Sequence, residues 1–155
     1  MSRWWAARRA RLTGDEGSAV LEFLGLTVVL LVPLVYLVVT LGRLEAATFA
    51  TEGAAREAAR TYVAADGSDE GAVRAVAAVG IALRDQGFHD DPASALTLTC
   101  SAVPCLTPGS DVSARIEVHV PLPFVPSFVR DVIPLEVPVS VERVAPVDTY
   151  RTTDD

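Results

Sequence analysis

Twenty consecutive uncharged residues, Phe23–Gly42, constrain this chain more than any other feature of its sequence. At a rise of about 1.5 Å per residue, a helix of this length spans roughly 30 Å, the thickness of the hydrocarbon core of a bilayer. The run is longer than the apolar part of an ordinary secretory signal, and no A-x-A cleavage site follows it closely. We therefore predict a retained transmembrane helix, with a buried core helix as the alternative.

The charges around the apolar run predict its direction. Four arginines precede the run, at positions 3, 8, 9 and 11, and no compensating basic loop follows it. By the positive-inside rule the N-terminus lies in the cytoplasm and the C-terminal part lies outside. The chain carries a net charge of -7 and contains no lysine. This balance argues against nucleic-acid binding, which needs a basic face, and it excludes any chemistry based on lysine.

An acidic residue, Glu22, stands directly before the apolar run, five residues after Gly17. On a helix, Ser18 and Glu22 lie four positions apart and share one face. If the chain is cut after Gly17, Ser18 acquires a free, largely protonated α-amine, which the Glu22 carboxylate can balance. Glu22 also lies in the first turn, where the helix dipole favours negative charge. The alternative is a last polar residue that reaches to the membrane interface.

The order of a basic leader, Gly17, "SAVLE" and an apolar helix resembles a class III, or type IV pilin-like, signal. In that family a prepilin peptidase cuts on the cytoplasmic side directly after the glycine, and the glutamate is the fifth residue after the cut. "EGSAVLEF" and the later "EAATFATEGAAREAARTYV" are similar to the TadE-like and TadG-like pseudopilins of tight-adherence (Flp pilus) systems. "CLTPGSDVSARIEVHVPLPF" and "VERVAPVDTYR" also look like that family's sheet region and end. Flp major pilins are much shorter than this chain, which makes it a poor candidate for the major subunit.

The resemblance implies a TadE-like minor pseudopilin, or an assembly component, of Flp pilus biogenesis. It implies cleavage between Gly17 and Ser18 and an assembly charge pair at Glu22. The implied partners are membrane lipid, the prepilin peptidase and other Tad/Flp pilus proteins, including other pseudopilins. The alternative function is an uncleaved single-pass membrane protein whose outer domain binds an envelope partner or a ligand.

Beyond the span, the pattern predicts an α+β fold. Alanine-rich sequence extends the first helix to about residue 65, and a second helix is expected over Glu70–Gln86, with Gly87 at its C-cap. From Ala95 the apolar period changes to two, which predicts a three-stranded antiparallel sheet. The expected strands carry Leu96 and Leu98, then alternate residues from Val112 to Val120, then alternate residues from Leu135 to Val141. The two helices cover the apolar face of this sheet, in a pilin-like lollipop.

Two sets of residues are expected to pack these elements together. The apolar stripe predicted for the second helix consists of Val73, Val76, Val79, Gly80 and Leu83. Small residues on the outer half of the first helix are Ala46, Ala47, Ala50, Gly53, Ala54 and Ala58. They suit close packing either on the chain's own domain, which we favour, or on neighbouring helices.

The sequence therefore divides into five predicted segments. These are a cleaved, cytoplasmic basic leader (1–17), a transmembrane helix (18–42), an extracytoplasmic continuation of that helix (43–66), a soluble α+β domain (67–147) and a flexible tail (148–155). The expected location is the cell membrane, with a single span and an extracytoplasmic C-terminal domain. Within the segment 121–134, apolar residues recur at helical spacing between prolines. This segment is either a helical crossover at a sheet edge or a contact with a partner or the membrane surface.

Cys100 and Cys105 are the two cysteines of the chain, and the predicted topology puts both outside the membrane, where disulfides persist. We expect a disulfide that closes this short loop. His89 and His119 are isolated in the sequence, and "HDD" at 89–91 is best interpreted as a solvated turn. No constellation for catalysis is recognisable, so we expect no enzymatic activity, no cofactor and no bound metal.

Overall fold

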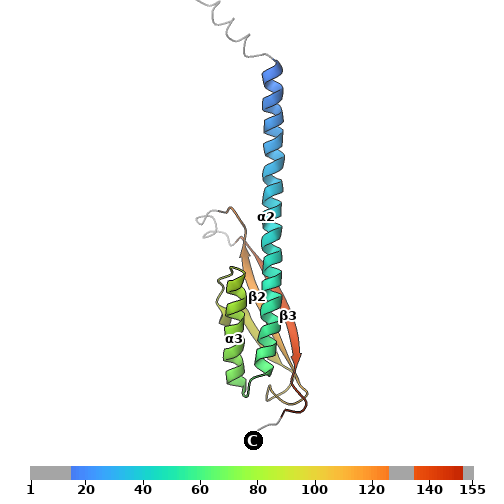
Figure 1. Cartoon of the computed structure of the whole chain (residues 1–155), viewed down its shortest axis with the longest axis vertical. Coiled ribbons are helices and arrows are strands. Elements are labelled where there is room, and N and C mark those ends of the chain that lie inside the picture. Colours follow the sequence, from blue (N-terminus) through green and yellow to red (C-terminus); the bar gives the residue numbers. More distant parts are fainter. Residues whose placement is uncertain (1–14, 126–134, 152–155) are drawn as a thin grey trace, which may run out of the picture. The chain divides into compact units, whose positions relative to one another are not determined.

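The computed structural model of the chain describes residues 15–125 and 135–151. It divides between Val39 and Thr40 into an N-terminal unit and a C-terminal unit. The helices are α2 (Asp15–Val63), α3 (Ser68–Asp85) and the short α4 (Pro92–Ala95), and the strands are β1 (Leu96–Cys100), β2 (Asp111–Pro121) and β3 (Glu136–Pro146). The predicted α+β class is confirmed, with one long N-terminal helix, a second helix and a three-stranded sheet (Figure 1).

The sheet is an antiparallel meander with strand order β1-β2-β3. In the register, Leu96 lies opposite Ile116, and Ile116 lies opposite Val141. The alternate residues of β2 from Val112 to Val120 are buried, as the sequence predicted, and their neighbours face outward. The corresponding residues of β3 are only half-buried, because β3 is at the edge of the sheet. The sequence therefore predicted both the alternation of side chains along the strands and the antiparallel arrangement of the sheet.

The segment between β2 and β3 differs from one of our two expectations. Pro121 pairs with Glu136, and the Leu122 N–H donates to the Leu135 carbonyl at 3.1 Å, so the strands are joined as a β-hairpin. Neighbouring antiparallel strands need no crossover, so this connection is not one. Most of the stretch expected to be helical, from Phe124 to Val132, lies outside the described residues, and its helix stays a prediction.

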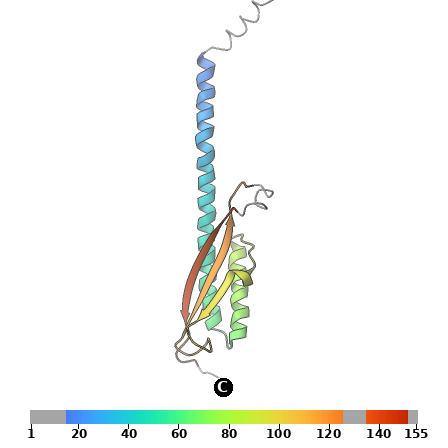
Figure 2. The ribbon, with the colours of Figure 1, turned by 180° about the vertical axis from the view of Figure 1, so that it is seen from behind.

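The helices α2 and α3 cover one face of the sheet, and the other face is open (Figures 1 and 2). The core is a single cluster that joins six alanines of α2 to the inward face of β2 and to the buried stripe of α3. The six are Ala47, Ala50, Ala54, Ala55, Ala58 and Ala59, all nearly inaccessible. Small side chains let the helix lie close to the sheet. Most of the small residues named in the sequence therefore pack on the chain's own domain, whereas Gly53 is exposed.

The buried face of α3 is rotated relative to the predicted stripe. Its buried residues are Gly71, Ala75, Val79, Gly80 and Leu83. Val73, predicted to lie in the core, is 71% exposed. The two helices approach closely at Gly71, where a Cβ atom would lie 3.0 Å from the carbonyl oxygen of Tyr62 in α2. Gly71 therefore faces α2, and Val79 and Leu83 of the predicted stripe are buried as expected.

The ends of α3 are close to the prediction. The helix begins at Ser68, with Gly67 as an N-cap that contributes no side-chain hydrogen bond. It ends at Asp85, followed by the C-cap residue Gln86 and by Gly87 at a φ of 77°. The Phe88 N–H then donates to the Leu83 carbonyl at 2.9 Å. A left-handed glycine directly after the C-cap is a common helix stop.

Candidate functional site

The residues that carry the predicted cleavage site lie in the first turns of α2. Gly17 and Ser18 are the third and fourth residues of the helix, which begins at Asp15. Ser18 and Glu22 are both exposed, one turn apart on the same face. The leader arginines at positions 3, 8, 9 and 11 lie outside the described residues. The structure thus places Ser18 and Glu22 in one helix, four positions apart.

The apolar segment that follows has no protein cover in the described chain. Every residue from Ser18 to Val38 is exposed, and its large apolar side chains range from Tyr36, at 37%, to Leu21, at 72%. By length and composition α2 is long and apolar enough to cross a membrane. The alternative of a buried core helix does not fit, because a core helix is buried on at least one face. This exposed apolar helix is therefore a candidate membrane span.

The polar groups within this segment are compatible with lipid. The Thr27 hydroxyl donates to the Phe23 carbonyl at 2.8 Å, within the helix itself. Pro33 lies inside the helix and has no N–H, which leaves one carbonyl a turn earlier without its usual donor. Membrane helices tolerate such prolines when neighbouring groups satisfy the freed carbonyl.

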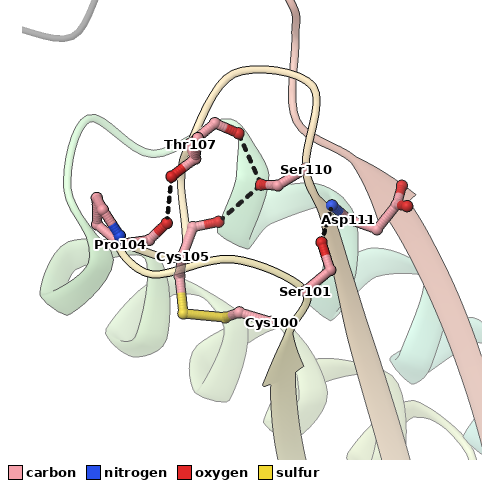
Figure 3. The surroundings of a disulfide bond; sticks show 7 residues. All are labelled: Cys100, Ser101, Pro104, Cys105, Thr107, Ser110 and Asp111. Carbon is pink, nitrogen blue, oxygen red and sulfur yellow. Dashed lines mark hydrogen bonds between the residues drawn. A yellow bond between two sulfur atoms is a disulfide. The ribbon is translucent and has the colours of Figure 1, made fainter.

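The predicted disulfide between Cys100 and Cys105 is present, with a sulfur–sulfur distance of 2.01 Å (Figure 3). It closes the first part of the connection between β1 and β2. The rest of the loop is held by its own polar groups. The Thr107 hydroxyl donates to the Pro104 carbonyl at 2.6 Å, and the Ser110 hydroxyl lies 2.6 Å from the Thr107 carbonyl. The loop is therefore fixed by side chains as well as by the covalent bridge.

Both histidines line one cleft of about 450 Å³ in the C-terminal unit, although they are thirty residues apart. His119 lies 3.7 Å from Glu117, and its backbone N–H donates to the Asp90 carboxylate at 3.3 Å. A second, more polar cleft of about 330 Å³ lies against it and shares Asp90 and His119. Within the described ranges, no group of three or more histidine, cysteine, aspartate or glutamate residues is arranged to hold a metal ion.

The open face of the sheet carries an ion pair between Arg115 and Glu142, at 2.7 Å. Ser113 also donates a hydrogen bond to the Glu142 carboxylate. These two hydrogen bonds, first that of Ser113 and then that of Arg115, hold the pKa of the Glu142 carboxyl below its usual range. Arg115 and Glu142 thus join β2 to β3 on the open face of the sheet.

Two arginines join the C-terminal part of the chain to α2, and the sequence did not reveal either. Arg143 on β3 forms an ion pair with Glu52 of α2. Arg151 donates hydrogen bonds to the backbone carbonyls of Val63, Ala65 and Asp66, at 3.1, 2.5 and 2.7 Å. Residues 148–151, assigned to a flexible tail, are therefore held against the end of α2. A single arginine near a C-terminus gives no pattern from which this contact can be predicted.

The C-terminal unit also begins earlier than the predicted soluble domain. It starts at Thr40 and includes the outer half of α2, whose alanines form a large part of its core. The predicted boundary between the helix continuation (43–66) and the soluble domain (67–147) therefore separates residues that pack together in one core. The continuous helix through Val63 agrees with the predicted extension of the span.

Comparison of the chain with protein-family models, with curated proteins and with solved structures finds no match.

Proposed function

We propose that this chain is a membrane-anchored minor pseudopilin, or assembly component, of Flp (Tad) pilus biogenesis. The observation that carries the proposal is the position of Glu22, one helical turn after Ser18 and directly before an apolar segment that no described residue covers. A glycine, Gly17, immediately precedes Ser18. The same order of glycine, glutamate and span is what resembles the TadE-like pseudopilins.

The chemistry at this position has two steps. A prepilin peptidase hydrolyses the peptide bond between Gly17 and Ser18, which removes the leader and leaves an ammonium group on Ser18. Because Ser18 and Glu22 share a helix face, the Glu22 carboxylate stabilises that ammonium group, either in its own chain or in a neighbouring subunit. In the uncut chain Gly17 lies in the first turn of α2, where backbone N–H groups lack helical partners and the turn frays readily. Fraying there gives a peptidase access to the bond.

The proposed orientation places the leader in the cytoplasm and the C-terminal unit outside the membrane. The four arginines before the span, with no basic loop after it, support this direction. The Cys100–Cys105 disulfide in the C-terminal unit supports it as well, because disulfides persist in oxidising compartments outside the cytoplasm. In this orientation the unit is free to meet other pilus proteins and pseudopilins.

N-terminal sequencing of the membrane-extracted protein, co-expressed with its prepilin peptidase, tests the proposal. We expect a mature chain that begins at Ser18. The Gly17→Ala variant serves as the matched control and should keep its leader. An intact leader in the wild-type chain, with no difference between it and the Gly17→Ala variant, contradicts the proposal.

The role of Glu22 needs a separate experiment. The Glu22→Ala variant should be processed normally but should fail in pilus assembly, because the ammonium group of Ser18 loses its counter-charge. Glu45→Ala is the control, since Glu45 is an exposed acidic residue farther along the same helix. Normal piliation by the Glu22→Ala variant would show that no charge pair is needed.

An uncleaved single-pass membrane protein with a ligand-binding C-terminal unit is the second candidate. The polar cleft of about 330 Å³ on the open face of the sheet favours it, because Arg115, His119 and three carboxylates line that cleft. Sequencing separates the candidates, since this function requires no cut after Gly17.

A further inference from the structure

The outer edge of β3 is a row of backbone groups that no strand of the described chain pairs with. β3 pairs with β2 on one side and lies at the margin of the sheet on the other (Figure 2). The Leu122 N–H donates to the Leu135 carbonyl at 3.1 Å, and the Val147 N–H donates to the Ser110 carbonyl at 2.8 Å. The register between these two bonds is continuous. Because hydrogen-bonded residues alternate in an antiparallel ladder, the odd-numbered residues of β3 bond to β2, and the even-numbered residues direct their N–H and C=O groups to the free edge.

Two prolines frame the part of this edge that can accept a new strand. A proline has no N–H, so Pro138 and Pro146 cannot donate to an added strand. Between them, Ser140, Glu142 and Val144 each direct an N–H outward, and we call these three residues the edge window. The guanidinium of Arg143 donates to the Glu142 carbonyl at 3.2 Å, but a carbonyl oxygen has a second lone pair. The window therefore offers both donors and acceptors to a further strand.

The side chains beside the edge window differ between the two faces of the sheet. On the open face, Glu142 accepts a hydrogen bond from Ser113 and pairs with Arg115 at 2.7 Å, yet its side chain remains 43% exposed. On the face toward the helices, Val139 and Val141 are only half-buried. Successive side chains of a strand point to opposite faces, so a strand added here covers these valines with one face and brings a residue of its other face beside Glu142.

We propose that the edge window of β3 binds an extended segment of a partner protein, with a basic side chain beside Glu142 and apolar side chains on its other face. Main-chain hydrogen bonds hold a segment that is added to a sheet edge, and its alternate side chains select it. A positive charge beside Glu142 continues the alternation of charge that begins with Arg115, and the net charge of -7 also attracts a basic segment. The proposal depends neither on cleavage after Gly17 nor on a role in a pilus.

A second copy of this chain fits the edge window poorly. If two copies of β3 pair antiparallel with all their window residues opposite one another, Glu142 of one copy lies opposite Glu142 of the other. Like charges directly opposite on neighbouring strands are destabilising. The edge strands β1 and β3 contain one basic residue between them, Arg143, and it already pairs with Glu52. A partner that brings its own basic residue is therefore the occupant that the charges favour.

Hydrogen–deuterium exchange, followed by NMR on the full chain in detergent micelles, tests the edge window residue by residue. The probe is a synthetic peptide in which valine alternates with arginine and threonine, acetyl-RVTVRVTVR-amide. The control peptide has glutamate in place of each arginine. Without peptide, the amides of Ser140, Glu142 and Val144 should exchange much faster than the ladder amides of Val141 and Arg143. An excess of the arginine peptide should slow exchange at the three window amides several-fold, and the glutamate peptide should not.

Three variants separate strand addition from general electrostatic attraction. Val144→Pro removes one outward N–H at a position equivalent to that of Pro146, and should weaken binding of the arginine peptide several-fold. Glu142→Gln should weaken it several-fold as well, because the basic side chain loses its partner. Glu117→Gln is the matched control: it removes the same charge from an exposed position on β2, away from the edge, and should change binding little. Near-ultraviolet circular dichroism checks that each variant keeps its fold.

Several results would overturn the proposal. The arginine peptide could leave exchange at the window amides unchanged, or both peptides could slow it equally. Equal weakening by Glu142→Gln and Glu117→Gln would show that the attraction is not specific to the edge. Slowing that arises without peptide and grows with protein concentration would identify a second copy of the chain as the occupant. N-terminal sequencing is independent of all these measurements, so the edge window and the cleavage after Gly17 can fail separately.

Discussion

The guanidinium of Arg151 donates hydrogen bonds at the C-terminal end of α2, and the shortest of them, 2.5 Å, is to the carbonyl oxygen of Ala65. The last carbonyls of a helix have no partner within the helix, and this side chain donates to the carbonyl of Val63, the last residue of α2, and to those of Ala65 and Asp66 just after it. The last described residue of the chain thereby holds residues more than eighty positions away. A contact of such sequence separation ties the C-terminus to the same unit as the helix.

Arg151→Ala should lower the free energy of unfolding of the C-terminal unit by about 1.5–3 kcal/mol, the range for hydrogen bonds to charged groups. Arg151→Lys should restore only part of the loss, because one ammonium group cannot match the planar fork of donors. Denaturant titration of the full chain in detergent, followed by near-ultraviolet circular dichroism, measures both. Tyr150→Ala is the control and should change little, since Tyr150 is 91% exposed. An Arg151→Ala variant as stable as the control would contradict the prediction.

Gly71 and Gly53 should respond in opposite ways to substitution by alanine. A Cβ atom on Gly71 would lie 3.0 Å from the Tyr62 carbonyl oxygen, so Gly71→Ala should destabilise the unit by about 1–3 kcal/mol, as overpacking does. A Cβ atom on Gly53 meets nothing within 4 Å, so Gly53→Ala should stabilise the helix by about 0.5–1 kcal/mol. Thermal unfolding of both variants gives the two signs, and equal effects would show that α2 and α3 do not approach closely.

The ion pair between Glu52 and Arg143 should contribute little, despite its place between α2 and β3. The side chains are 38% and 40% exposed, so solvent screens their attraction. A double-mutant cycle with Glu52→Gln and Arg143→Gln should give a coupling free energy of about 0.2–1 kcal/mol that decreases with added salt. A larger, salt-independent coupling would mean that the pair is shielded from water.

Removal of the disulfide should destabilise the C-terminal unit without unfolding it. Cys105 follows Cys100 by five positions, and closing so short a loop contributes about 2 kcal/mol through the entropy of the unfolded chain. The double variant Cys100→Ser, Cys105→Ser should lose that amount in denaturant titration. Wild-type protein kept in reductant is the control and should match the variant; a large difference between the two would point to an effect of the serines themselves.

Glu142 should make the free energy of unfolding of the C-terminal unit decrease at low pH. Because the hydrogen bonds of Ser113 and Arg115 hold its pKa below the usual value of 4.5, the carboxylate stabilises the fold above that pH. The stabilisation is lost as the pH falls through the lowered pKa of the folded state. Glu142→Gln should reduce the loss of stability in acid, and Ser113→Ala should move the carboxyl pKa upward in a carbon-13 NMR titration. An unchanged pKa in the Ser113→Ala variant would contradict the stated cause.

The sequence by itself determined the features that depend on neighbouring positions. These features are patterns among residues that are close in the sequence. They are the apolar run Phe23–Gly42, the alternation of buried and exposed residues from Val112 to Val120, and the short spacing between Cys100 and Cys105. A helix or strand imposes its period on consecutive side chains, so a periodic sequence predicts the element and its buried face. The shared helix face of Ser18 and Glu22 can be predicted for the same reason.

The tertiary structure decided the features that depend on distant residues. Glu52 has an arginine four positions ahead on its own helix, at Arg56, yet its carboxylate pairs with Arg143 on β3. Val73 is exposed whereas Gly71 lies close to Tyr62 of α2, and Arg151 is held by the carbonyls of Val63, Ala65 and Asp66. No local period encodes such contacts, since a side chain takes the partner that the packed helices and strands bring within reach.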